Sequence, residues 1–485
     1  MSDEKAQPNP YKKGDRVIVT LSDVAEGDKL FARMPDGISA FLSRRVSDAP
    51  LAIGDEVEAE IIKIKKSYLE LFFQRLIKPS ELRSDPKCEH FGACGGCKWQ
   101  HVKYDEQVKL KEKKVRDALI HIGGFETPPF EEPISAPLIF GYRNKIEFSF
   151  CDKRFTLPNE IEEGRKSLDF ALGFHAPERY DKVIDINRCE IASDDMSRVL
   201  EIVKSYAMNS GLKPYSTKDH TGFWRHLAMR KAFHTGEVMV NLVTSEYLPE
   251  VLEPLAKLLV QSLGQNLASV VCNVTTAKSN VSFGESEYLL HGKPFITEKL
   301  GNYHFRISAN SFFQTNTLGA ELLYGVAEEF AEISGRETVF DFYSGTGSIS
   351  IFISARCKKV IGVELIESSV NDAKANAERN GVSNAEFFRW DMKDVRDVLK
   401  TIQITPDVII TDPPRAGMHP NAVKSMIELG SQRIVYVSCN PSSLARDGKL
   451  LAESGYKLEK VRAVDLFPHT NHIESVALFR KSNEN

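Results

Sequence analysis

Long apolar runs, a secretory leader and a strong charge of one sign are all missing from this chain. No hydrophobic stretch in the 485 residues reaches the length of a membrane span, so we expect no membrane association. The polar start, MSDEKAQPNPYKKGD, lacks the apolar core of a signal peptide, which predicts a cytoplasmic location. The net charge of −4 gives no overall sign of nucleic-acid binding but leaves local basic segments open.

Cysteine is also scarce, and no internal repeat or low-complexity stretch is visible. Eight cysteines in a reducing compartment argue against disulfides and favour metal binding or catalysis where they cluster. A composition of 42% hydrophobic and 27% charged residues is ordinary for a globular protein, and the length suits about three domains.

Residues 13 to 74 predict a small barrel of the oligonucleotide-binding type. Turn residues separate five short β-rich runs: VIVTL, KLFARM, GISAFL, EVEAEIIKI and YLELFF. The loops are basic, which fits either a solvated face or an RNA-contacting surface, and the segment alone does not decide between them. The basic residues are Arg44, Arg45, Lys63, Lys65 and Lys66.

Residues 104 to 121 predict a charged amphipathic helix, and mixed α/β structure follows from 130 to 300. The helix places Val108, Val115, Leu119 and Ile122 close to one face. The rest of its surface is crowded with cations, either solvated or contacting phosphates. They are Lys109, Lys111, Lys113, Lys114 and Arg116.

Strands and helices alternate from about residue 320, which predicts a parallel, doubly wound sheet. The loop after the strand TVFDFY holds Gly345 and Gly347, which let backbone approach a ligand closely. Glu364 ends the next strand, where an acid can accept hydrogen bonds from a ribose, and Asp391 ends the third. Position 350 is Ser, so the full Gly-x-Gly-x-x-Gly pattern is missing. That favours S-adenosylmethionine (SAM) over a dinucleotide.

Two further segments carry chemistry near the ends of later strands. The segment Asp412-Pro413-Pro414-Arg415 closes the fourth strand. It is similar to the loop with which amine methyltransferases accept a hydrogen bond from their target amine, although Arg415 stands where those enzymes have an aromatic residue. Cys439 follows the apolar run RIVYV, at the usual mouth of an α/β active site.

A thiol suits one kind of methyl transfer in particular. Carbon 5 of uracil is a poor nucleophile until a thiolate adds to carbon 6 and converts the ring to an enolate. A base must then remove the proton on carbon 5 before the thiolate can leave. Cys439 and Glu474, in HIESVALF, are the candidates for these two roles, and Asp412 could position the pyrimidine.

Together these segments resemble the SAM-dependent RNA 5-methyluridine methyltransferases, in particular the iron–sulfur branch that modifies 23S ribosomal RNA. The matching pieces span most of the chain: CEHFGACGGCKWQHVKYDEQVKLKEKKV, GYRNKIEFSF, ISANSFFQTN, DFYSGTGSIS, TDPPRAGM, VSCNPSSLARD and FPHTNHIESVALF. The resemblance implies that Cys439 is the nucleophile and Glu474 the base. It also implies a SAM and uridine pocket lined by Gln314, Tyr343, Glu364 and Asp412, with Asp391 as a weaker member.

The resemblance also implies an architecture. It has a barrel of the TRAM type at 1–75, a mixed α/β central domain at 76–300 and a Rossmann-like methyltransferase domain at 301–485. The barrel departs from the family pattern, with LSDVAEGDKL in place of the usual Gly-rich opening. We expect a monomer.

Cys88, Cys94 and Cys97 form a C-x5-C-x2-C cluster, with a tight Gly95-Gly96 turn between the last two. Three cysteines need a fourth ligand, for which Cys151, Cys189, Cys272 and Cys357 are the candidates. The family pattern places it in VIDINRCEI, at Cys189. Four such thiolates support a [4Fe-4S] cluster, with zinc as the alternative. Radical SAM chemistry needs a different spacing, C-x3-C-x2-C. The methyl transfer needs no electrons, so we expect the cluster to be structural or to shape an RNA surface.

Three other functions remain open. The nearest is the same reaction on the T-loop uridine of transfer RNA, whose common bacterial enzyme lacks the cysteine cluster. An amine methyltransferase would use the Asp-Pro-Pro loop and would not need Cys439. An RNA-binding or iron–sulfur sensing protein would carry a degenerate catalytic domain.

Overall fold

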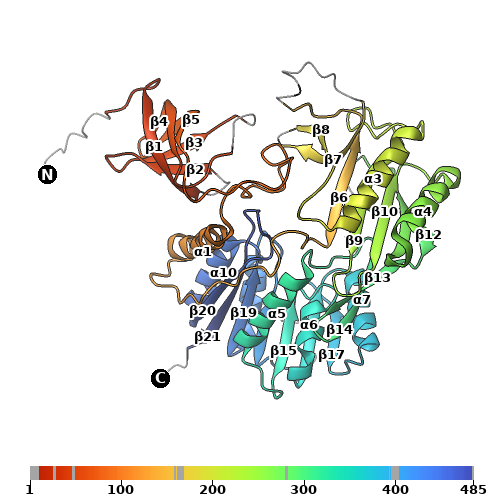
Figure 1. The fold of residues 1–485 in the computed structure, drawn as a ribbon. Helices are drawn as coiled ribbons and strands as arrows, with labels where there is room; N and C mark the ends of the chain where they lie inside the picture. The colour runs from red at the N-terminus through yellow and green to blue at the C-terminus, as the bar shows by residue number, and fades with distance from the viewer. Residues whose placement is uncertain are drawn as a thin grey trace.

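The computed structural model describes residues 10–25, 29–45, 50–157, 160, 169–177, 179–278, 282–392, 394 and 404–482. Its strands form a closed barrel, two seven-stranded sheets and a two-stranded hairpin (Figure 1). No helix in these ranges combines the length and apolar character needed to cross a lipid bilayer.

The N-terminal barrel is confirmed, with strand order β1-β2-β3-β5-β4. Apolar residues on alternate positions point inward, as in the centre of β4, where Val57, Ala59 and Ile61 are fully buried. Asp55 is also buried, and Arg83 in the following segment contacts it at 2.6 Å, which ties the barrel to the cysteine-containing loop. The strands are β1 (Arg16–Ala25), β2 (Lys29–Arg33), β3 (Ser39–Ser43), β4 (Glu56–Ile64) and β5 (Tyr68–Lys78).

The central domain is a seven-stranded sheet of order β12-β11-β10-β9-β6-β7-β8, in which only β10 and β11 pair in parallel. Helices α3 (Asp194–Asn209) and α4 (Pro249–Leu263) cover one face and bury leucines and valines against it (Figure 1). A short 3₁₀ turn, Gly264–Asn266, follows α4. The strands are β6 (Lys145–Cys151), β7 (Ala171–Ala176), β8 (Arg179–Asp185), β9 (Trp224–Lys231), β10 (Val238–Thr244), β11 (Leu267–Val274) and β12 (Ser286–Gly292).

The C-terminal sheet has the order β17-β16-β15-β18-β19-β21-β20, parallel except for β21, which is antiparallel to both β19 and β20. The chain winds from β15 towards β17 and then reverses to β18 and β19. This makes the carboxyl ends of β15 and β18 the switch point, where open α/β sheets bind ligands. The strands are β15 (Thr338–Phe342), β16 (Lys359–Glu364), β17 (Ala385–Arg389), β18 (Val408–Thr411), β19 (Arg433–Ser438), β20 (Tyr456–Val464) and β21 (Glu474–Lys481).

Helices cover both faces of this sheet. One core contains α5 (Thr317–Ala331), α6 (Ser348–Ile353) and α7 (Glu367–Arg379), with a 3₁₀ turn at Ser354–Arg356. The other core contains α9 (Pro420–Glu428), α10 (Pro441–Glu453) and α1 (Tyr104–His121), the predicted N-terminal helix. Thus α1 packs on α10 and β20, more than 300 residues further along the chain (Figure 1).

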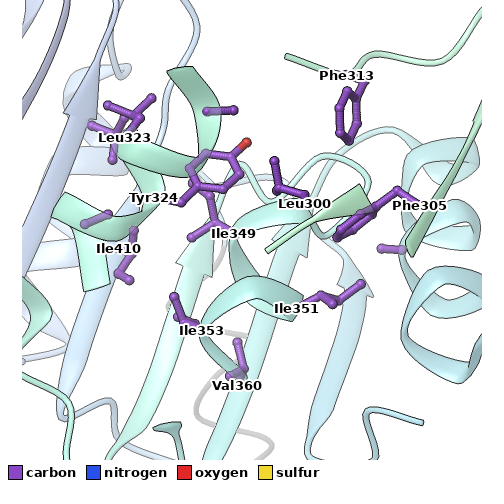
Figure 2. Close-up of a cluster of buried hydrophobic side chains, with 14 of the residues drawn as sticks. Leu300, Phe305, Phe313, Leu323, Tyr324, Ile349, Ile351, Ile353, Val360 and Ile410 are labelled. Carbon is purple, nitrogen blue, oxygen red and sulfur yellow. The ribbon is translucent and has the colours of Figure 1, made fainter. Parts of the chain in front are cut away.

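The hairpin β13 (Phe295–Leu300) and β14 (Tyr303–Ser308) joins the two large sheets. Leu300 and Phe305 pack beside Tyr324 of α5 and Ile351 of α6 (Figure 2). The hairpin also contacts β10 and β11 of the central sheet. The domain boundary placed at residue 300 stays a prediction, and it falls at the last residue of β13.

Two expectations for α1 are wrong. Lys111, expected among the surface cations that are solvated or contact phosphates, is fully buried, because it lies on the same helix face as Val108 and Val115 and bonds Asp465. Ile122, expected on the buried face, is 43% exposed, because the helix ends at His121 before Ile122 can pack.

Candidate active site

Cys439 lies directly after β19, and its neighbours fix the turn around it. The Asn440 N–H donates to Ser438 Oγ at 3.1 Å, and that hydroxyl donates to the Asn440 carbonyl at 2.9 Å. The Asn440 side chain caps α10 by accepting from the Ser442 N–H at 3.1 Å and donates to the Arg415 carbonyl at 2.8 Å. The candidate nucleophile is therefore tied to the Asp-Pro-Pro-Arg loop.

That loop is also fixed at its far end. Gly417 has a φ of 79°, and a Cβ there would lie 2.7 Å from the Ser443 Cβ, so glycine is required by both conformation and space. The next residue, Met418, donates its N–H at 2.9 Å to Asp447, a buried carboxylate on α10 that also accepts from Tyr436 at 2.7 Å. The segment between β18 and α9 is thus held in one position against α10.

Two acids, the buried Glu474 and the half-buried Asp412, act on the Cys439 thiol. Burial raises the pKa of the Glu474 carboxyl well above its ordinary value, and the charge of Asp412 adds to the shift while Arg415 opposes it. Burial likewise raises the pKa of Asp412 to about 7, with Asp341 adding to it. For the Cys439 thiol, burial and then Glu474 and Asp412 raise the pKa to about 11, and Arg415 opposes them. The structure therefore brings together the two residues predicted to act as nucleophile and base.

The predicted donor loop has the expected shape. Gly345 and Gly347 have φ of 53° and 79°. A Cβ on Gly347 would lie 2.9 Å from the Phe387 ring, whereas one on Gly345 would meet nothing within 4 Å. Glu364 accepts from the N–H groups of Gly345 at 3.1 Å, Leu365 at 2.8 Å and Ile366 at 2.9 Å. This carboxylate is oriented before any ligand arrives.

Two polar atoms beside this loop lack partners. Asp341 is fully buried and uses Oδ2 to accept from the N–H and the hydroxyl of Ser350, at 3.1 and 2.6 Å. Its Oδ1 and the Ser344 hydroxyl have no hydrogen bond in the described part of the chain. Unpaired buried polar groups are costly, and a polar ligand in the crevice would satisfy them. The Asp341 carboxyl oxygen and the Ser344 hydroxyl suit SAM, because the sulfonium and amino groups of SAM are cationic.

The remaining predicted pocket residues lie around the same loop. Tyr343 has a φ of 62°, a strained value for a non-glycine residue, and the charges of Asp391 and Glu364 contribute to its raised pKa after burial and Asp447. Gln314 interacts with the hydroxyl of Tyr324, which in turn bonds Ser348 Oγ at 2.9 Å. The residues predicted for SAM are therefore gathered at one end of the crevice.

The segment leading to Glu474 is held by Lys111 and Gln107 of α1, for which the sequence predicted no such role. Lys111 Nζ donates to Asp465 at 2.7 Å and to the Phe467 carbonyl at 2.9 Å, with Lys111 and Asp465 both buried. Gln107 accepts from the His469 N–H at 2.8 Å, and His469 has a φ of 67°. Helix α1 therefore positions the segment that carries the candidate base.

The cysteine-containing loop meets the same segment. The N–H groups of Lys98 and Trp99 both donate to the His469 carbonyl at 2.9 Å, and the Tyr142 hydroxyl donates to the Pro468 carbonyl at 3.0 Å. The His469 ring stacks on Phe140 with centroids 4.4 Å apart. Contacts therefore join the cysteine loop to His469, five residues before the candidate base Glu474.

All four predicted cysteine ligands line one cavity of about 420 Å³. Burial raises the pKa of Cys94 and Cys97 to about 11 and that of Cys189 to about 12, with neighbouring cysteines adding to each shift. The Asn187 N–H donates to His90 at 3.1 Å and brings the two segments together. Among the described residues, no three side chains form a group that could hold a single metal ion.

The three other candidate thiols lie elsewhere. Cys151, Cys272 and Cys357 are buried in the central and catalytic cores. Cys272 lies 3.3 Å from the Thr244 hydroxyl, and Cys357 donates to the Ile353 carbonyl. None of the three lines the cavity of the four.

Cys439 opens into a cleft of about 1050 Å³ between the catalytic domain, α1, the cysteine loop and the barrel. Residues of the catalytic domain form one side of the cleft. Helix α1 and the barrel strands β1, β2 and β3 contribute to the other sides. The lining includes Phe31, Arg33, Phe41, Lys98, Trp99, Lys113, Lys114, Arg415, Cys439 and His472.

Some of the predicted cations are already paired. Lys113 contacts Asp23 of the barrel at 2.6 Å as well as Asp117, and Lys109 contacts Glu106 at 2.8 Å. The basic face of α1 is therefore partly used to fasten the barrel.

Comparison with known proteins shows the family of this chain. Residues 182–482 match the model of the tRNA (uracil-5-)-methyltransferase family. The chain is 44% identical over 476 residues to an uncharacterized RNA methyltransferase of Chlorobaculum tepidum, covering 97% of this chain and 98% of the relative. It is 37% identical over 443 residues to another from Porphyromonas gingivalis, covering 89% and 94%.

A solved structure is similar over nearly the whole chain. It is the Pyrococcus abyssi tRNA (uracil-54, C5)-methyltransferase in complex with S-adenosyl-L-homocysteine, 29% identical with a TM-score of 0.70, covering 96% of this chain and all of that one. The predicted fold class, the donor SAM and the reaction class are confirmed. The chain belongs to the tRNA (uracil-5-)-methyltransferase family, whose members are SAM-dependent enzymes that methylate RNA uracil at carbon 5.

Proposed function

We propose that this enzyme methylates uridine through a covalent Cys439 adduct. The thiolate of Cys439 bonds to carbon 6, and the electron pair of the 5,6 double bond moves towards the carbonyl oxygen at position 4. SAM supplies the methyl group as an electrophile that carbon 5 attacks. Glu474 then removes the proton on carbon 5, the double bond re-forms, and the sulfur leaves carbon 6. The observation that carries the proposal is that the Cys439 thiol, at the carboxyl end of β19, interacts electrostatically with the carboxyl groups of Glu474 and Asp412.

The raised pKa values suit these roles. A carboxyl group whose pKa lies well above its ordinary value is a stronger proton acceptor once it is ionised. Asp412, with a pKa of about 7, is present in both forms near neutral pH. Its neutral form donates a hydrogen bond to the developing negative charge of the ring, and its ionised form accepts from the ring N–H.

We propose 23S ribosomal RNA as the substrate. The support is the cysteine loop, whose sequence resembles the iron–sulfur branch that acts on that RNA, and whose four cysteines line one cavity. Transfer RNA is the second candidate, because the similar Pyrococcus abyssi protein is a tRNA uracil-54 methyltransferase.

A [4Fe-4S] cluster held by Cys88, Cys94, Cys97 and Cys189 is part of the proposal. The donor set is four thiols around one cavity, which fits such a cluster. The role that follows from the contacts is structural, since the cysteine loop bonds the His469 carbonyl on the segment leading to Glu474. No step of the methyl transfer requires the cluster to gain or lose an electron.

Two variants test the chemistry. Cys439→Ala should form neither methylated RNA nor a protein–RNA adduct. Glu474→Gln keeps the thiol but removes the base, so an adduct with methylated RNA should accumulate and migrate slowly on a denaturing gel. Methylation by Cys439→Ala would reject the covalent route and favour an amine methyltransferase using Asp412.

Two further measurements settle substrate and metal. Mass spectrometry of 23S and transfer RNA from a strain lacking the protein should show uridine in place of 5-methyluridine in the 23S fragments. Loss of the methyl group from transfer RNA alone would reject the ribosomal assignment. The purified protein should be brown with about four irons per chain, and Cys189→Ser should lower the iron content whereas Cys272→Ser should not. Stoichiometric zinc would reject the cluster.

A further inference from the structure

Two phenylalanines on the outside of the barrel face the cleft of the nucleophile. Phe31 of β2 and Phe41 of β3 are directly paired across the two strands. Their rings contact edge to face, with centroids 5.6 Å apart. Phe41 makes a second such contact with Tyr68 of β5 at 5.4 Å. Both phenylalanines line the cleft into which Cys439 opens.

These rings do not serve the barrel core. The inward positions beside them are Ala32, Ala40 and Leu42, all buried, and strand alternation turns Phe31 and Phe41 to the outer face. A large aromatic residue is a poor choice for a strand face that only meets water, because its apolar surface stays unburied. Two paired ones at the mouth of a catalytic cleft point to a ligand.

Positive charge surrounds the same place. The Arg33 guanidinium lies 5.6 Å from the centre of the Phe31 ring. Lys98, Lys114 and Arg415 line the same cleft, from the cysteine loop, α1 and the Asp-Pro-Pro-Arg loop. Aromatic faces interleaved with cations are the usual arrangement for an unpaired nucleic-acid strand, in which bases stack and phosphates contact the cations.

We propose that Phe31 and Phe41 form a stacking platform for an unpaired base of the substrate RNA that flanks the target uridine. This inference rests on the proposed function and adds a binding subsite on the barrel. A uridine that reaches Cys439 must leave its stack, so its neighbours lose a stacking partner. The two rings replace that partner on the strand that continues from Cys439 along the cleft. Stacking tolerates any base, so the platform secures the strand while the sequence is read elsewhere.

The test is RNA binding by the full-length protein, with single-stranded oligouridylate as one probe and a fully paired RNA hairpin of equal length as the other. Phe31→Leu and Phe41→Leu keep an apolar side chain but remove the aromatic face. Each should bind oligouridylate roughly 5- to 150-fold more weakly, the usual range for one lost base–aromatic stack. Binding of the hairpin, whose bases are already stacked, should be unchanged.

Three controls isolate stacking. Phe72→Leu alters another ring of the barrel, which lies under Arg45 at 5.6 Å and outside the cleft lining, and should bind normally. Phe31→Tyr restores an aromatic face and should restore affinity. Arg33→Gln should reduce the slope of log affinity against log salt, whereas Phe31→Leu should leave that slope unchanged, because stacking releases no counterions.

The platform is rejected if Phe31→Leu and Phe72→Leu bind oligouridylate alike, or if hairpin binding falls equally. The adduct assay on a denaturing gel tests the covalent mechanism independently of the binding measurements. A wild-type protein that binds oligouridylate through Phe31 but never forms the Cys439 adduct would leave the platform standing. Normal oligouridylate binding by Phe31→Leu, together with adduct formation by the wild type, would reject the platform alone.

Discussion

The two ends of the catalytic crevice are built in different ways. At the donor end, Gly345, Asp341 and Glu364 belong to one strand–loop–helix–strand unit, and three backbone N–H groups orient the Glu364 carboxylate. At the reaction end, no described residue donates a hydrogen bond to the Asp412 or Glu474 carboxyl group. The Glu364 carboxylate at the donor end is thus oriented before SAM binds, whereas both carboxyl groups at the reaction end are left for the uracil ring to bond.

The supports of the two ends differ as well. The donor loop is held by residues within about one βα unit of it. The segment that carries Glu474 is held by Lys111 and Gln107, which lie 354 and 362 residues away from their partners in the chain. Substitutions in α1, far from the reacting groups, should therefore affect the reaction end before the donor end.

The largest expected effect comes from Lys111→Met. It leaves Asp465 as a buried charge without its partner, which typically costs about 3–5 kcal/mol of stability. Lys109→Met on the exposed side of the same helix loses only a surface pair with Glu106, worth about 0.5 kcal/mol or less. Urea unfolding measures both. In folded Lys111→Met protein, adduct formation should fall while SAM affinity, measured by calorimetry, is kept.

Equal destabilisation by the two substitutions would show that the Lys111–Asp465 pair contributes no more than a surface pair. A loss of SAM affinity as large as the loss of adduct formation would show that the two ends are not separately supported.

Glu364→Ala should have the opposite selectivity. The substitution removes the charged acceptor for the ribose hydroxyl groups of SAM. Such a hydrogen bond is worth roughly 1.5–3 kcal/mol, or about 10- to 150-fold in SAM affinity. Calorimetry measures the loss, and Glu367→Ala, an exposed glutamate three residues away that contacts Arg389, is the control. Unchanged SAM affinity would place the ribose elsewhere.

These ends also differ in how far the sequence predicted them. The donor loop, Glu364 and Asp412 follow predictable strand ends, so alternation of strands and helices located them. Glu474 needed the family resemblance, because a carboxylate at a strand start has no local signal. Lys111 had a signal that was missed. It is spaced three residues from Val108 and four from Val115, the spacing of one buried helix face. Its partner Asp465 could not be found, since no local pattern relates positions 354 residues apart.

Arg415→Gln should weaken the nucleophile by a smaller factor. The Arg415 guanidinium lowers the pKa of the Cys439 thiol, which burial and the two acids raise to about 11. Removing it raises that pKa further, so a smaller fraction of thiolate is present at every pH below it. An exposed charge is worth about 0.2–1 kcal/mol, so attack at pH 7.5 should slow by roughly 1.4- to 5-fold and the rate profile should move to higher pH. Adduct formation in a Glu474→Gln background measures this, and Arg389→Gln is the exposed control. An unshifted profile would contradict the assignment.

The last expected effect concerns charge at the junction of the two ends. Burial raises the pKa of Asp341 and of Asp412 to about 7, with Glu364 adding to the first shift and Asp341 to the second. Both are therefore largely neutral at pH 6 and largely ionised at pH 8. SAM carries a positive sulfonium, whereas its demethylated product has a neutral sulfur. A carboxylate attracts the cation only when ionised, so the preference for SAM over product should rise as pH increases through 7. The increase should be up to about tenfold, the equivalent of one pKa unit of coupling.

Calorimetric affinities for SAM and for its demethylated product between pH 6 and 8 measure this increase. Asp412→Asn should reduce the pH dependence, because the remaining amide cannot ionise. A preference that is constant with pH would mean that these carboxyl groups lie too far from the sulfur of SAM to interact with it.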